Sequence, residues 1–381
     1  METTNFIPAQ HFSPGYYIRE ELEAREWTQE DFAEIIGRPL VAVNQIITGK
    51  RAVTPDTAKA LAEAFGTSAQ VWLNLESAYR LQEATHADPS ISRRAKLYDY
   101  APIAEIARRG WISTTESLDT LESEVLKLFG ATSLDTRPTW EVAARKSDDY
   151  QKYSTSELAW FARLRQLGRA VSAKPFNRGT FEKNLPKLRS LCGDAENIRH
   201  LPKALAEFGV RFVVVEKLRN TRIDGGTTWL SDESPVIGVS LQFDRLDSFW
   251  HTVFHELMHV KNGDKFVIDV DMIADAKGTN KGPKPLHEVK VDVEAANYLV
   301  PENELTAFIA RVSPFFSKTE IRNFANKIKI NPGIVVGQLH HGEHVHWKYN
   351  REMLLQGQIR DIVSTAAITD GWDSRLGTLG V

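Results

Sequence analysis

His255-Glu256-Leu257-Met258-His259 is the stretch that decides how the C-terminal part of this chain folds. It lies in residues 247–260, where apolar side chains recur with the period of a buried helix. Two histidines four residues apart share one helix face, so both imidazoles can bind one zinc ion. Glu256 then reaches the metal-bound water as a general base. The alternative for a lone motif of this kind is a buried helix with two core histidines.

A zinc site needs a third protein ligand, and a predicted helix over residues 288–301 offers one. Glu288 and Asp292 lie four residues apart on one face of that helix. Glu288 is the predicted ligand, and Asp292 is placed to accept the second ring proton of a zinc-bound histidine. Glu294 is the rival ligand, but it lies about 240° around the helix from Glu288. His287 is one residue away from the ligand face.

Other histidines raise the question of further ligands. His251 stands one turn before His255 on the same face, where a packed or hydrogen-bonded histidine is the preferred interpretation. The tract from His340 to His346 holds four histidines and could bind a second metal ion. We interpret that tract as a solvated turn after a helix over residues 334–339.

The segment before the zinc motif changes from helical to strand periodicity. Helices are predicted over residues 155–167, 180–191 and 196–208, and strands over residues 210–215, 223–230 and 235–241. The middle strand contains Gly225-Gly226 and is either bulged or divided into two. Residues 236–240 are the candidate edge strand for pairing with an extended peptide, with an ordinary core strand as the alternative.

Length and composition set the class of the protein. With 381 residues, 42% hydrophobic and 25% charged, the chain is an ordinary globular protein of two or three domains. The net charge of −3 excludes a uniformly polybasic surface, so any nucleic-acid contact needs a local patch. Cys192 is the only cysteine, so no intrachain disulfide forms. Because we find no signal sequence and no run of eighteen apolar residues, we expect a cytoplasmic protein without a membrane segment.

Residues 1–80 are predicted to form a bundle of short helices. Ser13-Pro14 opens the first helix, Thr28 and Asp31 form a capping box for the second, and Gly37 ends it. A further helix follows over residues 38–47, and Gly49-Lys50-Arg51 breaks it. Two short helices joined by a glycine turn and followed by a basic loop are typical of a helix-turn-helix. A bundle for dimerisation or docking is the alternative, because the first helix is acidic.

These features divide the chain into four predicted parts. Residues 1–80 form the helix-turn-helix domain, residues 81–140 a helical connector, residues 141–350 a zinc-peptidase-like domain, and residues 351–381 an extension. The fold class is α+β and mostly helical, with a small sheet before the zinc helix.

The N-terminal segment resembles the HigA-type antitoxins of the XRE helix-turn-helix family. The matching residues are Ser13-Pro14-Gly15, the run from Thr28 to Ala33 with Gly37, Ile46-Ile47-Thr48-Gly49-Lys50-Arg51, Thr54-Pro55, Gly66-Thr67-Ser68 and Trp72-Leu73-Asn74-Leu75. The resemblance implies a recognition helix over residues 38–47 in the major groove of DNA. It also implies a homodimer on a palindromic operator of double-stranded DNA, with a cognate toxin or repressor protein as a further partner.

The same resemblance assigns the DNA contacts. Those expected to face phosphates are Gln29, Lys50 and Arg51, and Arg38 begins the recognition helix. Asn44 and Gln45 can make bidentate contacts to adenine. Where such helices commonly carry polar or basic side chains, this chain has Leu40 and Val41, which touch thymine methyl groups or pack internally.

Residues 208–347 resemble the ImmA/IrrE family of metallo-endopeptidases. The resemblance rests on the histidine motif, on Glu288 and Asp292 followed by Leu299-Val300-Pro301, and on Asn331-Pro332-Gly333-Ile334-Val335-Val336-Gly337. It implies zinc held by His255, His259 and Glu288, with Glu256 as the base. We therefore expect a DNA-binding regulator or antitoxin with a zinc-dependent endopeptidase domain. In the alternative, the peptidase fold is a non-proteolytic sensor or a scaffold that binds a toxin.

Overall fold

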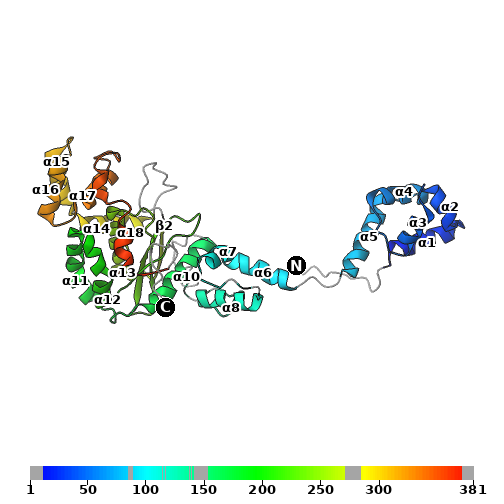
Figure 1. Cartoon of the computed structure of the whole chain (residues 1–381), viewed down its shortest axis with the longest axis horizontal. Coiled ribbons are helices and arrows are strands. Elements are labelled where there is room, and N and C mark those ends of the chain that lie inside the picture. The colour runs from blue at the N-terminus through cyan, green and yellow to red at the C-terminus, as the bar shows by residue number, and fades with distance from the viewer. Residues whose placement is uncertain are drawn as a thin grey trace. The chain divides into compact units, whose positions relative to one another are not determined.

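The structure is a computed structural model that describes residues 12–84, 89–113, 115, 117–136, 138, 140, 153–270 and 285–370. The chain divides into two compact units, Met1–Ile91 and Ser92–Val381. Figure 1 labels their helices and strands. The described residues are mostly helical with one small mixed sheet, which confirms the predicted balance of helix and strand.

The first unit is a bundle of helices. They are α1 (Pro14–Arg25), α2 (Gln29–Ile35), α3 (Leu40–Ile47), α4 (Pro55–Phe65) and α5 (Ala69–Glu83). The predicted capping box begins α2, because the Thr28 hydroxyl accepts from the Asp31 backbone N–H at 3.1 Å and the Asp31 carboxylate accepts from the Thr28 N–H at 2.9 Å. Gly66 ends α4 in the left-handed conformation.

Aromatic side chains hold this bundle together. The rings of Phe32 and Phe65 stack with centroids 5.0 Å apart, and Trp72 packs on Phe65. At Gly15, an added Cβ would lie 2.0 Å from the backbone oxygen of Ile47, so α1 approaches the end of α3 as closely as glycine permits. The unit therefore has a core of its own, and α1 supports α3 from behind.

The second unit is built on a five-stranded sheet with the order β4-β2-β3-β1-β5. Its strands are β1 (Arg211–Val214), β2 (Ile223–Trp229), β3 (Pro235–Val239), β4 (Phe266–Val270) and β5 (Ile368–Thr369). β1 runs parallel to β3 and β5, and β2 runs antiparallel to β3 and β4. The Gly225-Gly226 region belongs to one strand with a register irregularity against β4, as in the bulged alternative.

Two helices cover opposite faces of this sheet, α10 (Thr155–Ala170) and α13 (Leu246–Asn262) (Figure 1). Alternate residues of β1 separate accordingly, since Phe212 and Val214 join the hydrophobic cluster of α13, and Val213 joins that of α10. The sheet is thus buried on both sides, and α13 is fixed against β2 and β3.

The predicted edge strand over residues 236–240 is wrong. β3 lies between β2 and β1, and all of its residues are buried. Among the described strands, β4 stands at the edge nearer to β2. The apolar run in β3 has the composition of a central strand, which is the alternative that the sequence left open.

The predicted connector, apart from its first residues, and the described part of the C-terminal extension belong to the second unit. Helices α6 (Pro89–Tyr100), α7 (Ile103–Arg108) and α8 (Leu118–Phe129) contribute Leu97, Ile106 and Phe129 to the cluster around α10. The described part of the extension contributes β5, the short helix η3 (Arg351–Leu354) and α18 (Ile359–Ser364). The boundary therefore lies at residues 91 and 92 rather than at 80 and 81, because apolar faces of the connector are buried in the second core.

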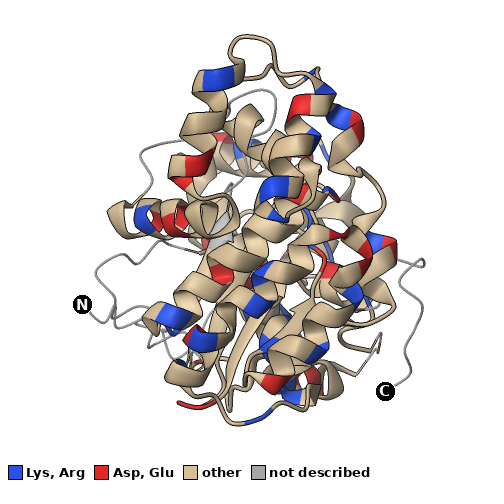
Figure 2. Cartoon of the chain, turned by 90° about the vertical axis from the view of Figure 1, so that its left-hand side faces the viewer, with Lys and Arg blue, Asp and Glu red and all other residues tan. Residues whose placement is uncertain are grey.

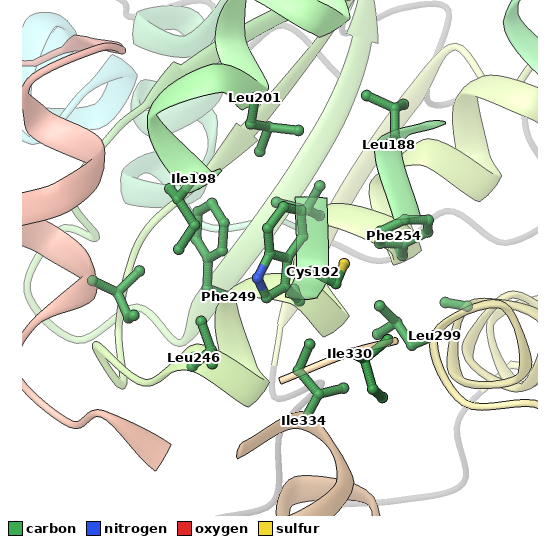
Figure 3. Close-up of a cluster of buried hydrophobic side chains, with 14 of the residues drawn as sticks. Leu188, Cys192, Ile198, Leu201, Leu246, Phe249, Phe254, Leu299, Ile330 and Ile334 are labelled. Atoms are coloured by element: carbon green, nitrogen blue, oxygen red, sulfur yellow. The ribbon is translucent and has the colours of Figure 1, made fainter. Parts of the chain in front are cut away.

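The remaining described helices of the second unit belong to the same hydrophobic cluster as α13. They are α11 (Arg178–Ser190), η1 (Leu191–Gly193), η2 (Ala195–His200), α12 (Leu201–Glu207), α14 (Leu286–Leu299), α15 (Glu302–Val312), α16 (Lys318–Ile328) and α17 (Pro332–His341). Of these, α11, α14 and α17 lie against α13 itself. The helix predicted over residues 196–208 is thus divided into η2 and α12. Figure 3 shows Cys192 among apolar side chains that include Phe254 and Ile330. No helix in the described part of the chain has the length and apolar character to cross a membrane.

Candidate functional site

The candidate metal centre is carried by α13. This helix is buried along most of its length and ends at Gly263, whose φ of 84° is left-handed. His255 and His259 lie on the same face one turn apart, as the spacing predicts. Neither histidine has any exposed surface, and neither has Glu256. Burial of three such polar side chains requires that each finds a partner inside the protein.

The ring nitrogens and a carboxylate converge. The Nε2 atoms of His255 and His259 lie 2.9 Å apart. Oε2 of Glu288, from α14, lies 3.3 Å from Nε2 of His255 and 3.5 Å from Nε2 of His259. Among the described residues, these three form one of two groups whose geometry could hold a metal ion. The structure therefore brings together the three residues predicted as ligands.

The other ring nitrogen of each histidine faces a carboxylate. Nδ1 of His255 lies 2.9 Å from Oδ1 of Asp292, and Nδ1 of His259 lies 2.8 Å from Oδ2 of Asp264. A hydrogen on each Nδ1 leaves each Nε2 as an acceptor with its lone pair toward Glu288. Asp292 occupies the place that the sequence predicts for it.

Sequence reasoning missed Asp264. The backbone N–H of Asp264 donates to the His259 carbonyl at 3.0 Å, so the cap at Gly263 returns the chain toward His259. The signal was available, because Asn262-Gly263 marks the helix end and an acidic residue follows it directly.

The donor set fits zinc. Tetrahedral zinc with imidazole nitrogens at about 2.0–2.1 Å places its ligand atoms roughly 3.3 Å apart. The three separations of 2.9, 3.3 and 3.5 Å lie around that value. Three acceptor atoms at these distances repel one another unless a cation or a proton lies between them. Two imidazoles and one carboxylate, each histidine oriented by a further carboxylate, are a usual zinc environment.

Electrostatics favour the charged form of Glu288. Burial alone would raise the pKa of this carboxyl, but when the two imidazoles donate protons to it, their hydrogen bonds and charges outweigh burial and hold its pKa well below the ordinary value. A cation bound in place of those protons would act in the same direction. Glu294, the rival ligand, instead pairs with Lys261, and His287 lies 2.8 Å from the other oxygen of Glu288. The face assignment from helical spacing separates the two glutamates as expected.

Glu256 is held against the sheet. The hydroxyl of Thr227, on β2, donates to Oε2 of Glu256 at 2.6 Å. A Cβ added at Gly225 would lie 2.3 Å from Oε1 of Glu256, whereas one added at Gly226 would meet Trp160 of α10 at 2.9 Å. The two glycines thus serve opposite faces of β2. Gly225 leaves room for the carboxylate.

The remaining histidines have other partners. Nε2 of His251 lies 3.8 Å from Oδ1 of Asp292, and His251, His255 and Asp292 form the second of the two groups of possible ligands. Nε2 of His340 lies 2.9 Å from the Tyr349 carbonyl oxygen. Within the described residues, no metal-ligand group includes the tract from His340 to His346.

The candidate DNA-binding surface is the outer face of α3. Its inner face buries Ala42, Val43, Ile46 and Ile47. Its outer face exposes Leu40 (40%), Val41 (68%), Asn44 and Gln45. Internal packing of Leu40 and Val41, one of the two predicted alternatives, is therefore wrong.

The predicted phosphate contacts flank this face. The side-chain amide of Asn44 donates to Oε1 of Gln29, the first residue of α2, at 3.3 Å. Lys50 and Arg51 are exposed in the loop after α3, and Arg38 is half-buried in the turn before it. The predicted DNA contacts thus come from α2, the turn, α3 and the following loop, which are consecutive in the chain.

Residues 18–72 match the helix-turn-helix family. An HTH-type transcriptional regulator, YddM of Escherichia coli (strain K12), is 37% identical over 76 residues, which cover 20% of this chain and 81% of that protein. The chain belongs to the helix-turn-helix family. Virulence-associated protein I of Dichelobacter nodosus is 36% identical over 89 residues, covering 23% of this chain and 81% of that protein.

Solved structures similar to the helix-turn-helix unit include two proteins of the HigA antitoxin family. An addiction module antidote protein of the HigA family from Coxiella burnetii has 36% identity and a TM-score of 0.19, covering 20% of this chain and 83% of that chain. The Pseudomonas aeruginosa antitoxin HigA with higBA promoter has 33% identity and a TM-score of 0.19, with the same coverage of 20% and 83%.

The family match covers both α2 and α3. In an XRE-type helix-turn-helix DNA-binding domain, the second helix of the motif reads the major groove and the first crosses the backbone. α3 is that second helix, and its exposed residues are those named above. The candidate metal centre lies outside the matched residues 18–72.

Proposed function

We propose that this chain is a DNA-binding transcriptional regulator of the HigA antitoxin type whose second unit is a zinc-dependent endopeptidase. The DNA-binding part is supported by the family match and by the exposed face of α3. The peptidase part is supported by one observation, the convergence of His255, His259 and Glu288 within 3.5 Å beside Glu256 in the sequence.

The residues of the chain divide the chemistry among them. A zinc ion held by His255, His259 and Glu288 would polarise a peptide carbonyl and acidify a water molecule. Asp292 and Asp264 keep the two imidazoles in the tautomer that presents Nε2. Glu256 accepts a proton from the attacking water and delivers it to the leaving amine.

Burial favours a second candidate function. Because His255, Glu256 and His259 have 0% exposed surface, a peptide can reach Glu256 only if a neighbouring segment moves. A regulator whose metal centre stabilises the fold or senses metal, without proteolysis, needs no such movement. The alternative is therefore a non-proteolytic regulator that binds DNA and a protein partner such as a toxin.

Metal content and cleavage together distinguish these functions. We expect the purified full chain to contain about one zinc ion, because the two groups of possible ligands share His255 and cannot both be filled through it. His255→Ala should lose the zinc, whereas His344→Ala, at an exposed histidine, should retain it. Glu256→Gln should retain zinc and lose cleavage of a peptide library. Zinc bound by the wild type without any cleavage would favour the second candidate, and zinc absent from the wild type would refute the metal function.

DNA binding is tested separately. Duplexes selected from a random pool should bind the full chain with a specificity that persists at two salt concentrations. Glu256→Gln should bind the same duplexes as the wild type, because α3 and Glu256 belong to different units. Absence of any sequence-specific complex at either salt concentration would refute the regulator function.

A further inference from the structure

A cavity of about 170 Å³ lies among α13, α14 and α17. It is smaller than the roughly 300–1,000 Å³ of drug-sized sites, which limits any occupant to a compact molecule. Its lining includes His251 and Asp292, but none of the three converging zinc ligands and not Glu256. The cavity therefore borders the metal centre on the Nδ1 side of His255, away from the Nε2 atoms.

The floor of the cavity is apolar. Leu299 and Ile334 are buried there, Val293 and Ala296 extend the apolar surface along α14, and Trp347 forms an aromatic wall. This part of the cavity favours the apolar portion of a ligand over water, because a water molecule would find few hydrogen-bond partners among these side chains.

With histidines counted as neutral, the lining carries one more negative than positive charge, since its charged side chains are Arg245, Asp247 and Asp292. Its other polar side chains are Ser248, His251, Gln338 and His341. Arg245 donates from Nε and Nη2 to the two oxygens of Asp247 at 3.1 and 3.0 Å, so this pair is neutral and largely satisfied. Asp292 remains as a further carboxylate, with a quarter of its side chain exposed and His251 beside it. A partly apolar lining with an excess of one negative charge is complementary to a small cation that bears an apolar group.

We propose that this cavity binds a small organic ammonium ion with an apolar body, and that Asp292 couples its occupancy to the metal centre. The ammonium donates to the Asp292 carboxylate, which also faces Nδ1 of His255 at 2.9 Å. A second donor on this carboxylate competes with His255 for its oxygens, so the affinities for amine and metal change together. The coupling rests on the proposed zinc function, whereas the binding of the amine does not.

Titration calorimetry with three matched probes tests the ligand class. Phenethylamine, 2-phenylethanol and phenylacetate share the phenyl ring and differ in the polar group. We expect the full chain to bind phenethylamine about tenfold more tightly than 2-phenylethanol, because the amine adds one charge-assisted hydrogen bond. Phenylacetate should bind least, because its carboxylate has the same charge as Asp292. Equal affinity for the amine and the alcohol would overturn the proposed class.

Two variants on one helix test the location. Ala296→Leu fills the cavity and should weaken phenethylamine binding at least tenfold, whereas Val289→Leu, exposed on α14 outside the lining, should change it less than twofold. Val293→Phe covers the cavity from a 58% exposed position and provides the same test if Ala296→Leu fails to fold. Unchanged binding in a folded cavity variant would overturn the location.

Zinc-loaded and zinc-free protein test the coupling. The dissociation constant of phenethylamine should differ between the two forms, and the dissociation constant of zinc should change by the same factor when phenethylamine is present. Identical constants would overturn the role of Asp292. If the chain binds the amine but never holds zinc, the proposed zinc function is refuted and the amine site in the cavity is kept. If the chain is a zinc peptidase that binds no amine, the amine site is refuted and the zinc function is kept.

Discussion

Exposed apolar side chains on the recognition helix predict that this protein reads thymine methyl groups. Val41 and Leu40 are 68% and 40% exposed in the first turn of α3. The N-terminal residues of a recognition helix are those that contact base edges in the major groove. In the major groove, the thymine methyl is the apolar feature available to such side chains. Replacing a contacted thymine by uracil removes only that methyl group.

The magnitude follows from the area that one methyl buries. About 0.8 kcal/mol per buried methyl corresponds to a roughly fourfold increase in the dissociation constant for each contacted thymine. A palindromic operator bound by a dimer presents each contact twice, so substitution in both half-sites should weaken binding about fifteenfold. Fluorescence anisotropy at one fixed salt concentration, with operators substituted one thymine at a time, measures these changes.

Variants connect the penalty to the side chains. Val41→Ser and Leu40→Ser should bind the thymine and uracil operators equally, because the apolar partner is gone. Val71→Ser, at a 48% exposed apolar residue of α5, should keep the full penalty. The reasoning fails if no thymine position responds to uracil, or if the penalty persists unchanged in Val41→Ser and Leu40→Ser.

Three further predictions concern the second unit. Asp264→Asn should weaken zinc binding about 10–100-fold in a competition assay with a chromogenic chelator, and unchanged affinity would contradict the role of this carboxylate. Gly225→Ala should displace Glu256 and lower peptide cleavage, because its Cβ would lie 2.3 Å from the Glu256 carboxylate. Gly226→Ala faces α10 and is the control: it should lower the melting temperature without a selective loss of cleavage. Cys192 is fully buried and burial raises the pKa of its thiol, so a thiol reagent should label it only after unfolding; rapid labelling of the folded chain would contradict this.

Local signals were sufficient for most helices. Thr28 and Ser68 cap the starts of helices, and Gly66 and Gly263 end helices. Side-chain capping and the left-handed glycine both involve residues within a turn or two of each other, so the sequence alone indicates them. The spacing of His255, His259 and Glu288 was informative for the same reason. Each helix presents a predictable face, although which helices meet depends on contacts distant in sequence.

Strand order and domain boundaries were not accessible in this way. β3 and β4 are similar short apolar runs that both pair with β2, and β3 is central only because its other side pairs with β1. The segment taken as a connector carries ordinary amphipathic helices, and nothing local indicates that Leu97 and Phe129 join the core around α10. Thr227 was missed because a side-chain partner on another strand is recognised only when the sheet is placed beside α13. Asp264 differs, because the helix end before it was a local signal that was not used.

The two proposed activities have separate physical foundations within one chain. Among the described residues, the buried apolar side chains that hold α3 form one cluster, and those that hold α13 form another with no residue in common. Loss of zinc leaves the three acceptors of His255, His259 and Glu288 facing one another, a repulsion confined to the second unit. A metal-site substitution that weakens DNA binding therefore cannot act through a shared core. It would have to act by changing the assembly of the protein or its partner, which the metal would then control.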